Sequence, residues 1–264
     1  MPFHYEKRGA IAYFSLDNPP VNVFTPAMHK QFFDALRDFC ADTNVHVGVW
    51  AGVGERSFCA GDDIKSPRLE RTTEQTIERQ LGVRHEAESL EYPGWESEVI
   101  AMTRHKPIVG AVNGHCLGQG FIYLMLMTDI RIASPNASFG LPEIAYGMGG
   151  AGGMMRLSRQ IPHSAAMWML LTGKPYDAEQ ALQHSIINEV VPMSELHARA
   201  EQLAEGIAAH PPLAVRTEME AYYRGQDMTR ADAQAFTAQL YRLQRLAFDP
   251  TPPLATVKPG ANDD

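Results

Sequence analysis

The chain has few cysteines, no long apolar run and no excess of basic charge. Its 264 residues include three cysteines, Cys40, Cys59 and Cys116, and their spacing is not that of paired metal ligands. A reduced, cytoplasmic protein without a metal site is therefore the simplest expectation. No apolar stretch approaches the roughly 20 residues that span a bilayer, and the N-terminal segment lacks the basic and then apolar layout of a signal peptide. We expect no membrane partner.

The formal net charge is −8 and the pI is about 5.7. This balance argues against binding to the phosphate backbone of nucleic acids as the main task. Apolar residues make up 45% of the chain and charged residues 20%, which is ordinary for a soluble globular protein. The length allows one large domain or two modest ones.

Buried strands and helices alternate along the chain, which predicts an α/β protein with a covered sheet. Apolar runs predict strands at 10–17, 45–52, 106–114 and 129–134. Apolar residues from Met28 to Phe39 recur at helical spacing, with Thr25 as the expected N-cap. Further helices are predicted between 154 and 209, and after Pro211 the chain is predicted to be helical to about residue 247. The polar segment 67–105 either forms a lid over a site or is a helical segment exposed to solvent.

Two glycine-bearing turns follow buried strands, "FCAGDDIK" after the second and "GHCLGQG" after the third. A turn that ends a strand and opens a helix presents backbone N–H groups, and the helix dipole favours negative charge there. Two such turns facing each other would place two N–H donors on one carbonyl oxygen. This arrangement is an oxyanion hole.

The series of motifs resembles the crotonase (enoyl-CoA hydratase/isomerase) superfamily from about Ala10 to Val215. The matching stretches, in order, are "NPPVNVFTPAM", "SFCAGDDIK", "KPIVGAVNGHCLGQG", "TDIRIASPNASFGLPEIAYGMGGAGGMMRL", "LLTGKPYDAEQALQHSIINEVV" and "HPPLAV". The resemblance implies a spiral of repeated ββα units over 1–210 that carries the acyl-CoA site. It also implies a helical oligomerisation region at 211–249 in a homotrimer or a dimer of trimers. Residues 250–264, rich in proline and polar residues, are expected to form a poorly ordered tail.

The same resemblance assigns roles within the two turns. The backbone N–H groups of Asp62 and Gln119 would polarise the thioester carbonyl of an acyl-CoA, and the Asp62 carboxylate is expected to point away from that carbonyl. Coenzyme A is expected only as part of the substrate, with no tightly bound cofactor. The residues expected to contact it are Cys59, Ala60, Asp63, Ile64 and Lys65, and those expected to line the acyl pocket are Gly118, Ile122 and Tyr146.

The chain departs from the hydratases of the family at one of their two catalytic carboxylates. Counted forward from "GHCLGQG", the first falls at Ile122, and counted back from Asp129 it falls at Tyr123. Neither residue is an acid. The second falls at Glu143 and is present. Without the resemblance, Glu143 would be interpreted as a loop acid that caps the next turn or pairs with Arg131 or Arg156.

A single carboxylate that removes a proton from one carbon and returns it to another suits an isomerase, so double-bond isomerisation of an enoyl-CoA is the preferred prediction. Hydration or dehydration and an inactive acyl-CoA-binding protein remain as alternatives. Tyr123 is a further catalytic candidate. Acids of the long polar segment could also replace the missing carboxylate, namely Glu86, Glu88, Glu91, Glu96 and Glu98.

Overall fold

The computed structural model describes residues 2–65, 70–81 and 94–247. The chain divides into two compact units, Met1–His210 and Pro211–Asp264. The predicted tail 250–264 and the candidate acids Glu86, Glu88 and Glu91 lie outside the described residues.

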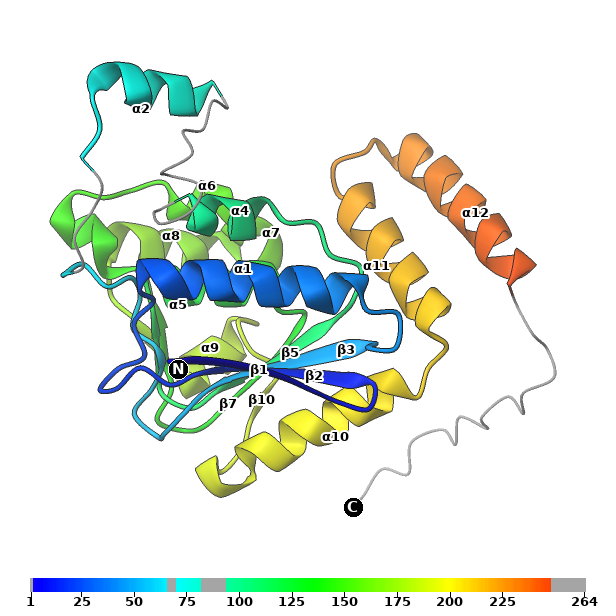
Figure 1. Cartoon of the computed structure of the whole chain (residues 1–264), viewed down its shortest axis with the longest axis horizontal. Coiled ribbons are helices and arrows are strands. Elements are labelled where there is room, and N and C mark those ends of the chain that lie inside the picture. The colour runs from blue at the N-terminus through cyan, green and yellow to red at the C-terminus, as the bar shows by residue number, and fades with distance from the viewer. Residues whose placement is uncertain (1, 66–69, 82–93, 248–264) are drawn as a thin grey trace. The chain divides into compact units, whose positions relative to one another are not determined.

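A six-stranded sheet forms the centre of the first unit (Figure 1). Its order is β1-β2-β3-β5-β7-β10, and only the β1–β2 pair is antiparallel. The strands are β1 (Phe3–Arg8), β2 (Ile11–Leu16), β3 (Val47–Gly52), β5 (Ile108–Val112), β7 (Ile130–Ala133) and β10 (Glu189–Val190). The four strands predicted from apolar runs are therefore confirmed as β2, β3, β5 and β7.

The two faces of this sheet belong to different apolar clusters, because successive side chains of a strand point to opposite faces. In β3, Trp50 packs in the larger cluster with residues of α1 (Pro26–Ala41), whereas Val49 and Ala51 pack against α10 (Leu196–Ala208). Figure 1 shows α1 and α10 on opposite sides of the sheet. This two-sided burial explains why the strands are apolar on both faces.

A second sheet of four short strands has the order β4-β6-β8-β9. Its strands are β4 (Ser57–Cys59), β6 (His115–Leu117), β8 (Ser138–Gly140) and β9 (Tyr176–Asp177), and β4, β6 and β8 run parallel. Each of these three follows a strand of the first sheet, so that β3–β4, β5–β6 and β7–β8 are successive strand pairs, each followed by helix. This repetition is the predicted series of ββα units. Strands of two or three residues carry too little periodicity to be predicted from sequence.

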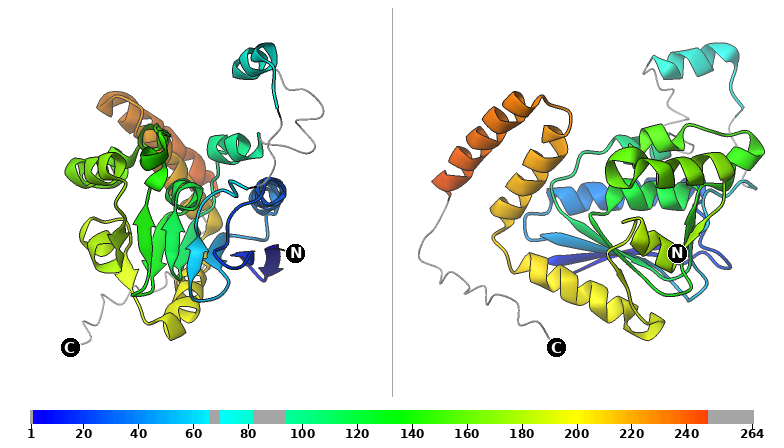
Figure 2. Two further views of the ribbon diagram at one scale, coloured as in Figure 1. Left: turned by 90° about the vertical axis from the view of Figure 1, so that its left-hand side faces the viewer. Right: turned by 180° about the vertical axis from the view of Figure 1, so that it is seen from behind.

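The helix predicted from Met28 to Phe39 is confirmed as α1. The Thr25 side chain accepts a hydrogen bond from the Met28 amide, as expected for an N-cap, and Pro26 begins the helix. Among the described residues, the first unit also contains the helices α2 (Thr73–Gln80), α4 (Trp95–Ala101), α5 (Gln119–Met127), η1 (Pro142–Tyr146), α6 (Ala151–Met154), α7 (Leu157–Gln160), α8 (His163–Thr172), α9 (Ala178–Gln183) and η2 (Met193–Glu195). Figure 2 shows these elements from two further directions.

The second unit contains two helices in its described part, α11 (Pro212–Gly225) and α12 (Arg230–Leu246). They pack against each other, and the Arg224 guanidinium lies 4.7 Å from the centre of the Phe236 ring. The side chain of Thr229 caps the start of α12 by accepting a hydrogen bond from the Asp232 amide. Across the described residues of both units, no helix combines the length and apolar character needed to cross a membrane.

Candidate active site

The candidate site lies where the three parallel strands of the second sheet end. The turn with Asp62 follows β4, the turn with Gln119 follows β6, and Glu143 lies in η1 just after β8. The carboxyl ends of neighbouring parallel strands lie at one edge of a sheet, so the topology brings these three residues together. They are 81 positions apart from first to last in the sequence numbering.

The first turn is held by the extended segment that precedes α1. The Ala60 amide donates to the Val21 carbonyl at 3.0 Å, the Phe24 amide to the Gly61 carbonyl at 2.9 Å, and the Asp63 amide to the Phe24 carbonyl at 2.8 Å. Phe24 and Asp62 form an isolated parallel bridge. The "NPPVNVF" motif therefore fixes the course of the "FCAGDD" motif.

The two turns touch each other through their glycines. Gly61 has φ +105°, and a Cβ built on it would lie 3.6 Å from the Gln119 amide nitrogen. Gly118 has φ +54° and donates its amide to the Gly140 carbonyl at 2.9 Å. A Cβ on Gly118 would collide with the Glu143 carboxylate. Gly118 is therefore required both for its backbone conformation and for the space that Glu143 occupies.

The amides of Asp62 and Gln119 are placed to act as donors. Gln119 is the first residue of α5, where an amide has no partner within its helix. Among the described residues, the Asp62 amide donates to no backbone carbonyl. The sequence thus brings two unused N–H groups from adjoining turns to the same place as the Glu143 carboxylate.

Glu143 is partly buried, and burial raises the pKa of its carboxyl above the ordinary value. A backbone hydrogen bond acts in the opposite direction, and the charge of Asp62 raises the pKa further. Within the described structure, Glu143 Oε2 is buried without a hydrogen-bond partner. A buried polar atom without a partner is uncommon in folded proteins, and a catalytic role is one explanation for it.

A chain of hydrogen bonds joins Tyr123, His29 and Asp62. The Tyr123 hydroxyl lies 2.7 Å from His29 Nδ1, and His29 Nε2 lies 3.0 Å from Asp62 Oδ1. Both His29 and Tyr123 are buried, whereas the Asp62 side chain is 32% exposed. The His29 ring also stacks on Phe24, with centroids 5.0 Å apart. The Asp62 carboxylate therefore has a fixed direction.

Sequence analysis did not identify His29 as a functional residue. It stands in the predicted helix beside Met28, on the face that also buries Phe32 and Leu36. The sequence shows only a histidine on an otherwise apolar helical face. Because such a histidine is usually a hydrogen-bonded core residue, this pattern does not by itself indicate a functional role. Its partners lie 33 and 94 positions away in the sequence, so only the fold reveals them.

Burial raises the pKa of the Tyr123 hydroxyl well above its ordinary value, and the charges of Asp62 and Glu96 act in the same direction. The hydroxyl therefore stays protonated. Glu96 lies in α4, so one acid of the long polar segment does approach this end of α5. Ile122, the other position at which the missing carboxylate was counted, is 6% exposed within the apolar core.

The residues predicted to contact coenzyme A occupy different depths of the first turn. Cys59 is fully buried, and burial raises the pKa of its thiol to about 12. Ala60 and Asp63 are half-buried, and Asp63 accepts a hydrogen bond from the Lys65 amide at 3.0 Å. Ile64 and Lys65 are exposed. The turn thus offers its outer residues to a ligand and keeps its thiol in the core.

Tyr146, predicted to line the acyl pocket, lies at the end of η1 and is 77% exposed. Gly118 lies at the centre of the site, between Gly61 and Glu143. Glu143 shows no ion pair with Arg131 or Arg156 among the described contacts. Arg131 instead donates to Thr128, to Gln160 and to backbone carbonyls.

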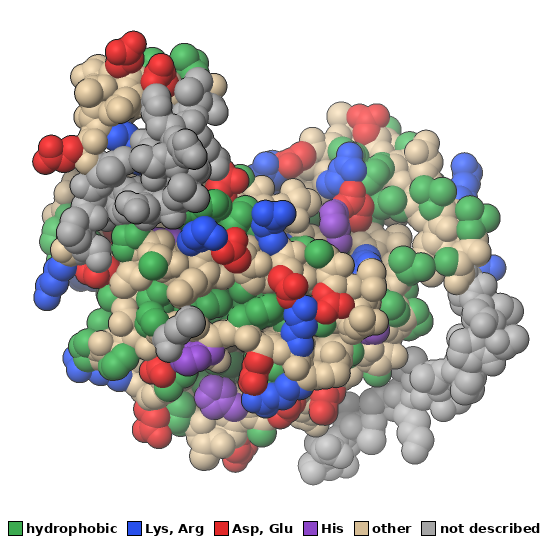
Figure 3. Space-filling model, in the orientation of Figure 1, with side chains coloured by type: hydrophobic (Ala, Val, Ile, Leu, Met, Phe, Trp, Pro, Cys, Tyr) green, Lys and Arg blue, Asp and Glu red, His purple; other side chains and the backbone are tan. Residues whose placement is uncertain are grey.

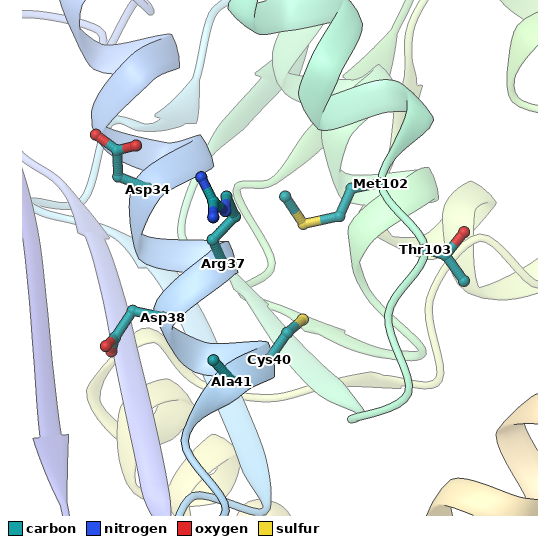
Figure 4. A pocket seen from close by; sticks show the side chains of 7 residues that line it. All are labelled: Asp34, Arg37, Asp38, Cys40, Ala41, Met102 and Thr103. Carbon is teal, nitrogen blue, oxygen red and sulfur yellow. The ribbon is translucent and has the colours of Figure 1, made fainter.

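A hollow of about 560 Å³ lies elsewhere, between the C-terminal half of α1 and the segment after α4 (Figure 4). Its lining residues are Asp34, Arg37, Asp38, Cys40, Ala41, Met102 and Thr103. None of these lining residues belongs to the candidate site. No group of three or more described His, Cys, Asp or Glu residues could hold a metal ion. On the face in Figure 3, acidic and basic side chains are interspersed.

The chain is similar to known proteins over most of its length. The family model for enoyl-CoA hydratase/isomerase matches residues 6–245. The chain is 34% identical to (E)-benzylidenesuccinyl-CoA hydratase of Thauera aromatica, over 86% of this chain and 84% of that protein. It is 32% identical to carnitinyl-CoA dehydratase of Proteus mirabilis, over 92% of this chain and 85% of that protein.

A crystal structure of enoyl-CoA hydratase from Bacillus anthracis shares the fold. The TM-score is 0.76 at 28% sequence identity, and the match covers 94% of this chain and 95% of that chain. The chain therefore belongs to the enoyl-CoA hydratase/isomerase family of the crotonase superfamily, a family of enzymes. The predicted crotonase-like α/β fold is confirmed.

Proposed function

We propose that the protein adds water to, or removes water from, the carbon–carbon double bond of an enoyl-CoA. The thioester oxygen would accept hydrogen bonds from the amides of Asp62 and Gln119, and Glu143 would transfer a proton at the α-carbon. The observation that carries this proposal is the position of the Glu143 carboxylate, against Gly118 in the turn that also carries the Gln119 amide.

Each part of the site has a task in this reaction. Addition of a nucleophile to an enoyl thioester creates an enolate, and donors aimed at its oxygen lower the barrier by several kcal/mol. A carboxyl group whose pKa is raised by burial holds its proton closer to neutral pH, which suits proton transfer to carbon. Ile64 and Lys65, exposed at the outer end of the first turn, are available to the coenzyme A portion.

Hydration or dehydration is preferred to isomerisation because of the relatives. The Thauera and Proteus proteins are named as a hydratase and a dehydratase of CoA esters. Isomerisation is the second candidate, and the absence of an acid at both Ile122 and Tyr123 supports it. A product that has gained the mass of water distinguishes hydration from a shifted double bond.

The test compares wild type with Glu143→Gln, using crotonyl-CoA and cinnamoyl-CoA as probes. We expect hydration by the wild type, at least a hundredfold loss of turnover in the variant, equivalent to about 2.7 kcal/mol, and unchanged binding of the CoA esters. Unchanged turnover would remove Glu143 from the mechanism. Binding by the wild type without any turnover would show an acyl-CoA-binding protein in place of an enzyme.

A further inference from the structure

Helix α5 carries no carboxylate, but an aspartate, Asp62, lies in the turn that adjoins the start of this helix. Asp62 directly follows Gly61, and Gly61 adjoins Gly118, against which the Glu143 carboxylate lies. The Asp62 side chain keeps 32% of its surface exposed, so its carboxylate is accessible to a water molecule. Its charge also acts on Glu143 and raises the pKa of that carboxyl. The Asp62 carboxylate therefore lies on the turn that adjoins Gly118, while the Glu143 carboxylate lies against Gly118 itself.

In each of the two hydrogen bonds that link Asp62, His29 and Tyr123, the chemistry of the side chains determines which group is the donor. An ionised carboxylate only accepts hydrogen bonds, so His29 Nε2 must carry the proton that faces Asp62 Oδ1. In a neutral imidazole, Nδ1 then accepts from the Tyr123 hydroxyl, which burial keeps protonated. Tyr123 fixes the tautomer of His29, and His29 in turn orients and stabilises the Asp62 carboxylate.

We infer that Asp62 is the second catalytic carboxylate and that His29 and Tyr123 are its positioning residues. This inference rests on the proposed hydration. Asp62 would act in two ways: its backbone amide would donate to the thioester oxygen, and its side chain would accept a proton from the water. The N–H donated by His29 partly offsets the negative charge that Asp62 places near the developing enolate.

The chemistry balances with these two acids. The water oxygen forms a bond to the β-carbon while Asp62 takes one proton from the water, and the π electrons move to the thioester oxygen. Protonated Glu143 then gives its proton to the α-carbon, which restores the carbonyl. Passage of a proton from Asp62 to Glu143 through solvent completes the cycle. One water is consumed and no group is oxidised or reduced.

The roles predict different effects on two reactions. Exchange of the α-proton of butyryl-CoA or 3-phenylpropionyl-CoA in heavy water needs Glu143 and the two amides, but no attacking water. Hydration of crotonyl-CoA or cinnamoyl-CoA needs Asp62 as well. For Asp62→Asn, which keeps the amide and the shape, we expect hydration to fall by about a hundredfold or more, while exchange stays close to the wild-type rate.

Three substitutions test the two positioning residues. His29→Gln retains a side-chain N–H, whereas His29→Leu retains none, so the glutamine variant should keep more hydration activity than the leucine variant. Tyr123→Phe should lower kcat for hydration and leave KM unchanged. The matched control is Tyr176→Phe, which removes another buried hydroxyl that donates to a carbonyl, that of Ala165, and should leave hydration unchanged. Thermal unfolding of every variant establishes that it is folded.

The outcomes separate this inference from the proposed function. If Asp62→Asn hydrates at the wild-type rate while Glu143→Gln does not, Asp62 has no catalytic role and the proposed function stands. If Asp62→Asn loses hydration and exchange together, its carboxylate serves enolate formation or the shape of the turn, and the inference is overturned. If Glu143→Gln also retains both reactions, Glu143 is removed from the mechanism as well, and the proposed function itself fails only if the wild type does not hydrate these esters. An Asp34→Asn variant on the surface of α1 controls for the loss of a carboxylate.

Discussion

The substitution Gly118→Ala tests the geometry of the site directly. Gly118 has φ +54° and ψ −127°, a conformation that residues with a Cβ rarely adopt. A strained backbone of this kind costs about 1–3 kcal/mol. In a chain of this length, each kcal/mol lowers the unfolding midpoint by about 2–4 °C. Alanine should therefore lower the midpoint measurably.

The new methyl group would also meet Glu143. It would collide with Oε1 and lie 3.2 Å from the carboxyl carbon, so the carboxylate has to move away. A misplacement of about 1 Å in a catalytic group can lower the rate by about a hundredfold. We expect a fall in hydration of this size, together with the loss of stability.

Gly206→Ala is the matched control. Gly206 lies within α10, and a Cβ there would meet nothing within 4 Å. Alanine at such a helical position stabilises by about 0.5–1 kcal/mol. The control should keep full activity and unfold at the same or a higher temperature. Full turnover and unchanged stability of Gly118→Ala would refute the placement of Glu143 against Gly118.

Two further predictions concern charge. Because burial raises the pKa of Glu143, the native state holds this proton more tightly than the unfolded chain, and folding stability is lost as the pH rises from the ordinary value through the raised one. The unfolding free energy of Glu143→Gln, measured with denaturant, should therefore rise relative to wild type across that window; a relative gain by wild type would contradict the burial. The buried Arg104 pairs with the largely buried Asp129 at N–O distances of 2.6 and 2.9 Å. Because Asp129→Ala leaves the buried Arg104 charge without this partner, it should cost up to about 3–5 kcal/mol of unfolding free energy. Asp34→Ala, which breaks the exposed pair with Lys30, should cost less than about 1 kcal/mol; similar costs would show that burial of the first pair is unimportant.

Local apolar runs were enough to predict four of the six strands of the main sheet. β2, β3, β5 and β7 are apolar on successive positions, and α1 has a capped start and a regular apolar face, so each was predictable from local sequence. β4, β6 and β8 were not, because three residues carry no usable period. Their pairing depends on partners that lie far away in the chain.

By itself, the sequence determined the family, the two glycine turns and the presence of Glu143, because these are properties of order and residue type. It could not determine what replaces the missing carboxylate. Counting along one segment pointed to position 122 or 123, whereas Asp62, the acid that we infer takes that role, follows a different strand. The Asp62–His29–Tyr123 contact joins three segments through hydrogen bonds, and only the packing of α1 and α5 beside the first turn brings those atoms within reach.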